Sequence, residues 1–140
     1  MKKLVLFATA LVFSAAVMAQ PSKATGADEI VKFNQETHNF GKIKQGVPVT
    51  YYFEIKNISD KPVVVENASA SCGCTVPEKP DQPINPGATA KLKVQYNAAT
   101  VGPIQKDVYV KFAGIETQKT LHITGEVVAA EPQQDAKKNN

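Results

Sequence analysis

Two cysteines separated by one residue hold most of the chemistry that this sequence could perform. They are Cys72 and Cys74, within Ser71-Cys72-Gly73-Cys74-Thr75, and the 140 residues contain no other cysteine. On a regular strand two such residues share a face, with Cα atoms roughly 7 Å apart, which is near the outer limit for a disulfide. A disulfide would therefore require a bend at Gly73, and glycine bends most readily.

Four interpretations of this motif stay open. They are a structural bend with an oxidised or buried pair, a redox-active dithiol, a soft-metal site for Cu(I) or Zn²⁺, and a close or covalent contact with a partner. Stability alone explains a disulfide poorly, because closing so small a ring adds less than about 2 kcal/mol in the chain-entropy model. Two thiolates are too few for a closed tetrahedral site, so we assign no metal ligand and no cofactor. The candidate binding motif is Cys72, Gly73, Cys74 and Thr75, with a predicted Cys72–Cys74 disulfide.

The other residue types give little support to catalysis. His38 and His122 are the only histidines, and no serine after the first 19 residues lies in a G-x-S-x-G frame. His122 stands between Leu121 and Ile123, so we expect a solvated strand histidine, whereas His38 is expected at the edge of the core near Phe40. The acidic residues are scattered and predict no paired carboxylates. We therefore expect no catalytic residues and a protein that is not an enzyme.

The first 19 residues have the three-part pattern of a secretory signal peptide. Lys2 and Lys3 form a basic start, residues 4–18 are apolar, and Val17-Met18-Ala19 offers a cleavage site without a cysteine that could accept a lipid anchor. The apolar run is shorter than the roughly 20 residues of a membrane span, and no later run is long enough. We expect cleavage after Ala19 and a periplasmic or secreted protein, in an oxidising compartment where cysteine pairs tend to be oxidised.

Composition favours a β domain and argues against nucleic-acid binding. After residue 19 the chain has 13 Val and 8 Ile but only 2 Leu, and β-branched residues pack well in sheets. The 16 basic residues are all Lys, and removing Lys2 and Lys3 lowers the net charge from +3 to +1. Arginine is the preferred residue for phosphate contacts, so we expect no nucleic-acid partner.

Apolar and polar residues alternate with period two over four segments, as in half-buried antiparallel strands. The expected inward sets are Val49, Tyr51, Phe53 and Ile55; Ala90, Leu92, Val94 and Tyr96; Val108, Val110 and Phe112; and Leu121 and Ile123. Shorter strands are expected around Phe33, over 40–43, and over 63–65, where the strand would be covered on both faces. The sequence thus predicts an all-β, immunoglobulin-like β-sandwich of about seven antiparallel strands, with no helix after the signal peptide.

The two ends of the chain are polar and predict the domain boundaries. We expect a signal peptide over 1–19, a flexible lead-in over 20–30, the immunoglobulin-like domain over 31–128 and a disordered tail over 129–140. Residues 131–140 contain no apolar side chain except Ala136. Such a segment buries too little surface to offset the entropy lost on ordering.

The order of several short motifs resembles one known family. The motifs are Phe40-Gly41, Gly46, Phe53-Glu54-Ile55-Lys56-Asn57, Cys72-Gly73-Cys74-Thr75, Pro86-Gly87 and Gly125. In this order the chain is similar to the exported bacterial domains of unknown function numbered one-five-seven-three, which are related to the immunoglobulin-like modules grouped with ASPM, SPD-2 and Hydin. The likeness covers about 33–128, with Ala113-Gly114 where members often carry an Asn-containing turn. It implies an immunoglobulin-like fold and export, but no reaction.

We therefore expect a non-enzymatic, exported binding or assembly module of the cell envelope, with a protein partner. The alternative is a redox-active or soft-metal-handling protein that acts through Cys72-Gly73-Cys74. The candidate binding surface is the segment 72–84, which contains Pro77, Pro80 and Pro83 and no regular strand pattern. Immunoglobulin-like sandwiches also bind by adding a partner's strand to an open sheet edge.

Overall fold

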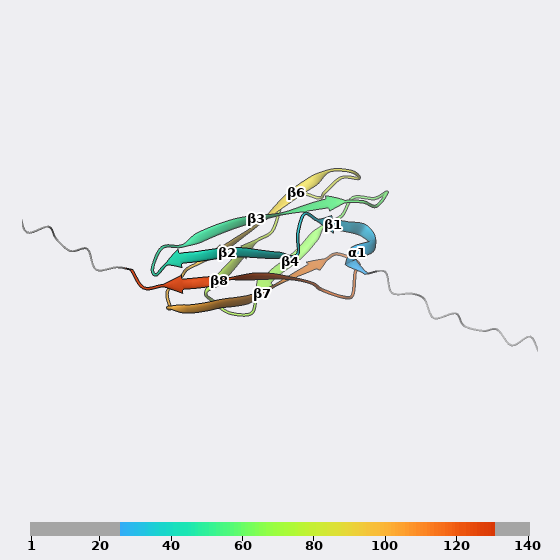
Figure 1. Cartoon of the computed structure of the whole chain (residues 1–140). Helices are drawn as coiled ribbons and strands as arrows, with labels where there is room; N and C mark the ends of the chain where they lie inside the picture. Colours follow the sequence, from blue (N-terminus) through green and yellow to red (C-terminus); the bar gives the residue numbers. More distant parts are fainter. Residues whose placement is uncertain (1–25, 131–140) are drawn as a thin grey trace, which may run out of the picture.

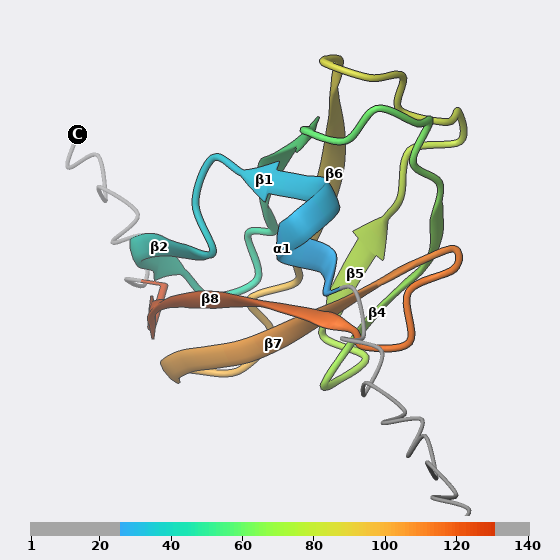
Figure 2. The same cartoon turned by 90° about the vertical axis from the view of Figure 1, so that its right-hand side faces the viewer.

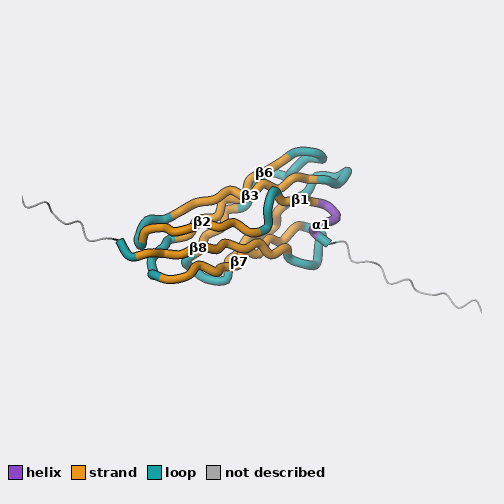
Figure 3. The backbone as a smooth tube through the Cα atoms, viewed as in Figure 1, coloured by secondary structure: helices purple, strands orange, loops and turns teal. Residues whose placement is uncertain are grey.

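The computed structural model describes residues 26–130, so the expected signal peptide, most of the lead-in and residues 131–140 lie outside the described residues. Within the described range one helical turn is followed by eight strands (Figure 3). The elements are α1 (Ala27–Ile30), β1 (Val31–Phe33), β2 (Thr37–Lys44), β3 (Val49–Asn57), β4 (Val65–Ala70), β5 (Thr75–Glu78), β6 (Thr89–Tyr96), β7 (Gly102–Phe112) and β8 (Lys119–Val128).

The strands form two four-stranded sheets that pack face to face (Figures 1 and 2). One sheet has the order β1-β3-β6-β5 and the other the order β2-β8-β7-β4. The expected immunoglobulin-like β-sandwich is confirmed, with eight strands where about seven were predicted. One pair differs in direction, because β2 runs parallel to β8, with Thr37 opposite His122. Alternation identifies a strand and its buried face but not the direction of its partner, which is why only antiparallel strands were predicted.

A helical turn lies where the sequence predicted a flexible lead-in and no helix. Residues 27–30 form α1, Ala27 is buried in the core, and the Val31 N–H donates to the Ala27 carbonyl. A single turn is too short to show the apolar period of a helix, so the sequence carried no signal for it.

The run Val63-Val64-Val65 is not a strand covered on both faces, which corrects that prediction. The strand β4 begins only at Val65 and continues to Ala70, whereas Val63 makes an isolated bridge to Ile84. Val63 and Val65 are buried and Val64 is exposed, so the run alternates like any half-buried segment. The remainder of β4, Glu-Asn-Ala-Ser-Ala, has small or polar side chains and therefore no apolar alternation to recognise.

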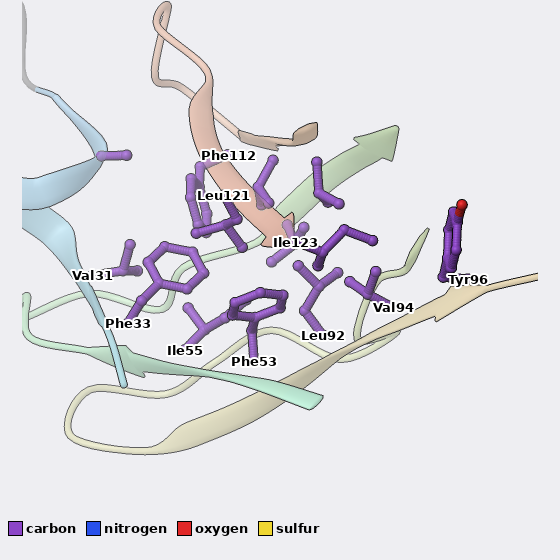
Figure 4. Close-up of a cluster of buried hydrophobic side chains, with 14 of the residues drawn as sticks. Val31, Phe33, Phe53, Ile55, Leu92, Val94, Tyr96, Phe112, Leu121 and Ile123 are labelled. Carbon is purple, nitrogen blue, oxygen red and sulfur yellow. The ribbon is translucent and has the colours of Figure 1, made fainter. Parts of the chain in front are cut away.

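The residues predicted to face inward make up much of the core between the sheets. Phe53, Ile55, Leu92 and Val94 line one layer, and all four are fully buried. Figure 4 shows this layer facing side chains of the other sheet. The opposite layer is supplied by β7 and β8 and includes Val108, Val110, Phe112, Leu121 and Ile123. Val49, Tyr51 and Ala90 of the predicted sets are only partly buried and pack against the edge of this cluster.

Gly125 of β8 lies where two backbones approach closely. Its φ is +148°, and a Cβ atom would lie 2.8 Å from the Gly41 carbonyl oxygen and 3.3 Å from Ile104 Cδ1. We expect Gly125→Ala to lower the free energy of unfolding by about 2 kcal/mol, because both the backbone conformation and the contact become unfavourable.

The matched control is Gly73→Ala, since Gly73 has open space around it and a φ outside the left-handed region. This substitution should change the free energy of unfolding by less than about 0.5 kcal/mol in the same denaturant titration. Equal losses for the two variants would contradict the close approach at Gly125.

Candidate functional site

The predicted motif forms a tight turn that leads from one sheet to the other. It connects β4, an edge strand of one sheet, to β5, an edge strand of the other. The Thr75 N–H donates to the Cys72 carbonyl at 3.3 Å, which closes the turn around Gly73. The Cα atoms of Cys72 and Cys74 are 5.3 Å apart and the sulfur atoms lie at disulfide distance. Gly73 thus leaves extended geometry as predicted, although its φ is one that other residues also adopt.

The backbone of both sheets holds this turn in place. On the β4 side, the Ser71 N–H donates to the Asp107 carbonyl at 2.9 Å, and the Asp107 N–H donates to Ser71 Oγ at 3.1 Å. On the β5 side, the Asn97 N–H donates to the Cys74 carbonyl at 3.0 Å. The two cysteines are therefore anchored at both ends, and the turn is part of the rigid sandwich.

Thr75, the last residue of the motif, is one of the few buried polar residues in the described chain. Its exposed fraction is only 3%. Its Oγ1 lies 3.8 Å from Cys72 Sγ and 3.9 Å from Cys74 Sγ, and these are the hydrogen-bond contacts of this hydroxyl among the described residues. A hydroxyl is a good donor, but a sulfur without charge accepts only weakly.

A pocket of about 480 Å³ opens beside Cys74. Its wall consists of Cys74, Lys106 of β7, Tyr96, Asn97, Ala99, Thr100, Val101, Gly102 and Pro103. At this end of the sandwich β7 begins at Gly102, several residues before Asp107. Its neighbour β4 ends opposite Val108. The part of β7 that lines this pocket therefore has no paired strand on the β4 side.

Lys106 is placed on the core-facing side of β7. Residues two apart on a strand share a face, and its neighbours Ile104 and Val108 are both buried. Its cross-strand partner in β8 is the buried Ile123. Lys106 itself is half-buried, and among the described residues its ammonium group has no hydrogen bond or ion pair. Alternation in the sequence did not single it out, because its cationic head gives no apolar signal.

Exposed valines surround this end of the sandwich. Val47, Val76 and Val101 have exposed fractions between 48% and 54%. Val76 follows the disulfide turn in β5, and Val101 lines the pocket. Val47 belongs to the β2–β3 loop. In this loop the Gly46 N–H donates to the Ala98 carbonyl of the β6–β7 loop at 2.9 Å, which holds the two loops together. We call this surface the disulfide end and define it by the turn 71–74, the three valines and Lys106.

Neither of the two histidines lines the pocket beside Cys74. His122 is half-exposed on β8, as expected, and its Nδ1 lies 2.7 Å from Asp107 Oδ1 on the neighbouring strand. The ring of His38 stacks on Tyr51 at a centroid distance of 3.6 Å and meets the edge of Phe40, so it lies at the core margin as predicted. Burial lowers the pKa of His38. Over residues 26–130, no three His, Cys, Asp or Glu side chains come together in a group suited to a metal ion.

The proposed binding segment 72–84 is not an irregular loop, which corrects that prediction. It contains β5, in which Val76 pairs with Gln95, and it ends at the Val63–Ile84 bridge. The segment therefore runs along one side of the sandwich from the disulfide end towards the opposite end. The prolines hid this strand, because proline is depleted in strands and restricted to their edges.

The described part of the chain contains no helix with the length and hydrophobicity needed to cross a membrane. The sequence matches a family model described as Protein of unknown function (DUF1573) over residues 31–127. No curated protein matches it.

Several solved structures share the fold. A protein of unknown function from Porphyromonas gingivalis W83 is 13% identical, with a TM-score of 0.62 over 70% of this chain and 46% of that chain. The VesB protease of Vibrio cholerae is 15% identical, with a TM-score of 0.56 over 71% and 32% of the two chains. The ASH/PapD-like domain 7 of human CEP192 is 12% identical, with a TM-score of 0.58 over 91% and 100%. This chain spans less than half of the first two proteins, and at such identities the likeness shows the fold alone.

Proposed function

Since the chain belongs to the DUF1573 family, which is described only as protein of unknown function, and folds as an immunoglobulin-like sandwich, we propose that it is a binding or assembly module and not an enzyme. Its place of action would be the cell envelope, as the signal-peptide pattern of residues 1–19 suggests. Its partner would be another protein, held at the disulfide end.

The observation that supports this surface is the gathering of apolar side chains on adjoining rigid segments. Single exposed hydrophobic residues are normal, but a contiguous group favours a protein interface. Val47, Val76 and Val101 each expose about half of their surface, and Val101 lines the pocket beside Cys74. The β6–β7 loop between them is fixed by hydrogen bonds from the Ala99 N–H to Asn97 Oδ1 and from Gln45 Nε2 to the Ala99 carbonyl, both 3.1 Å long. A surface that is already ordered loses little entropy when a partner binds.

Strand addition to β5 is a poorer explanation. The Asn97 N–H donates to the Cys74 carbonyl, and in an antiparallel pair only every second residue is hydrogen-bonded to the neighbouring strand. Thr75 and Pro77 therefore direct their backbone groups away from β6. The Thr75 N–H is already donated to the Cys72 carbonyl, and Pro77 has no N–H. The free side of β5 therefore lacks the donors that an added strand would require.

The test is capture of envelope proteins by the mature protein and by two variants of equal charge. Val76→Lys with Val101→Lys alters the disulfide end, whereas Ile58→Lys with Val64→Lys alters exposed residues of the β3–β4 connection at the opposite end. We expect recovery of the partner to fall at least about tenfold for the first variant only, because charges there lose their water on binding. Recovery of the same partners by the Val76/Val101 variant would show that the surface is wrongly assigned.

A further inference from the structure

We propose that the disulfide turn is also a site of thiol–disulfide exchange with cysteine thiols of other polypeptides, in which Thr75 and Lys106 stabilise the thiolate that is released. This activity goes beyond partner binding and does not depend on it. Three observations support it: the position of the Thr75 hydroxyl, the unpaired Lys106, and the pocket at Cys74.

The Thr75 hydroxyl is better suited to the reduced pair than to the disulfide. In the oxidised turn this buried group has only two long contacts, 3.8 Å and 3.9 Å, to sulfurs without charge. After reduction it faces a thiolate, and hydrogen bonds to charged acceptors are roughly twice as strong as neutral ones. The hydroxyl therefore stabilises the thiolate more than it stabilises the disulfide, and it reaches either sulfur without moving to a new site.

Lys106 brings a cationic side chain to the pocket that Cys74 lines. It lines the pocket together with Cys74 and has no counter-ion among the described residues. A cation held on the core-facing side of β7, partly out of water, interacts more strongly with a nearby anion than a fully solvated lysine does. In the oxidised protein the sulfurs of the turn carry no charge that could attract the Lys106 ammonium group. A thiolate on Cys74 would carry a negative charge that could.

These positions identify the attacked and the leaving sulfur. Cys74 shares the pocket with Lys106, so the thiolate is best accommodated there, and the incoming sulfur attacks Cys72. Both cysteines are half-buried, and Cys74 packs against the hydrophobic core. A leaving thiol that ionises more easily departs faster.

The exchange balances with two cysteine thiols as the co-reactant. A thiolate R–S⁻ attacks Cys72 Sγ, the R–S–Cys72 bond forms, the Cys72–Cys74 bond breaks, and its electron pair stays on Cys74 Sγ. A second thiolate R′–S⁻ then attacks the R sulfur, which forms R–S–S–R′ and releases Cys72 as a thiolate. The partner thiols lose two electrons and two protons, and the Cys72–Cys74 pair gains the electrons and, according to pH, the protons.

The test measures the rate of reduction of the purified mature protein by glutathione, and the pH dependence of thiolate absorbance in the reduced form. Thr75→Val removes the hydroxyl but keeps the shape, Thr75→Ser keeps the hydroxyl, and Lys106→Gln removes the charge. We expect Thr75→Val and Lys106→Gln each to slow reduction about tenfold and to move thiol ionisation to higher pH, with Thr75→Ser close to the unmodified protein.

Unfolding of the oxidised variants separates this role from a structural one. The exchange proposal requires the rate to fall while the unfolding midpoint of Lys106→Gln stays unchanged. Equal rates and titrations in all four proteins, or faster reduction of Thr75→Val together with a lower midpoint, would overturn it. So would two thiols that are free in the purified protein and react with alkylating reagents only after a chelator is added. Because glutathione replaces the partner, failure of the binding proposal leaves this test intact.

Discussion

Replacing Phe53 with alanine is expected to lower the free energy of unfolding by about 3 to 5 kcal/mol. Phe53 lies in the middle of β3, is fully buried, and meets the ring of Tyr51 at a centroid distance of 4.9 Å. Its removal leaves a cavity between the two sheets at the point where β3 pairs with Leu92 of β6. A loss of this size is a large part of the roughly 5 to 15 kcal/mol that stabilises a typical domain.

The matched control is the neighbouring residue on the opposite face of the same strand. Tyr52 is half-exposed and pairs with Lys93, so Tyr52→Ala should cost less than about 1 kcal/mol. Urea titration of the three proteins, followed by circular dichroism, measures both values. Coincident midpoints for Phe53→Ala and the unmodified protein would mean that the two faces of β3 are reversed.

The second large effect is expected at Asn57, where Asn57→Ala should cost about 3 kcal/mol. This residue is fully buried at the end of β3, and its Nδ2 donates to the carbonyls of Lys61 and Ile84, both at 2.7 Å. Its Oδ1 accepts hydrogen bonds from the N–H and the hydroxyl of Ser59, both at 2.8 Å. The single amide thus joins the β3–β4 turn to the segment before β6, and alanine would leave the buried Ile84 carbonyl with one partner fewer.

Asn39→Ala tests whether burial explains the size of this effect. Asn39 is exposed, and its side chain makes one bond, from the Gly41 N–H to Oδ1 at 2.7 Å. We expect a loss below about 1 kcal/mol in the same titration, since water replaces that bond. A loss at Asn57 no larger than the loss at Asn39 would show that the buried network contributes little.

The faces of the long strands could be predicted from the sequence because burial there follows period two. Leu92 and Val94 of β6 and Val108 and Val110 of β7 alternate with polar residues and are buried as expected. The pairing of the edge strands could not be predicted. The small, polar residues of β4 show no apolar pattern, and the parallel partner of β2 comes from distant sequence.

The candidate site was only partly visible in the sequence. The spacing of Cys72 and Cys74 indicated a bend and a disulfide, and the structure brings their sulfurs to disulfide distance. Lys106 reaches the pocket at Cys74 only through the register of β7, and Val101 only through the β6–β7 loop. Val47 comes to this end of the sandwich because the β2–β3 loop is hydrogen-bonded to the β6–β7 loop. Neither motif spacing nor alternation records such contacts, because they depend on which strands pair and where each strand ends.

Photo-crosslinking in intact cells tests most directly whether the disulfide end is the partner surface. A photoreactive residue at Val101 is compared with one at Ile58, since both side chains are half-exposed but lie at opposite ends of the sandwich. Partner binding at the disulfide end predicts a discrete higher-mass adduct from position 101 and none from position 58. An adduct from position 58 without one from position 101 would contradict the proposed function.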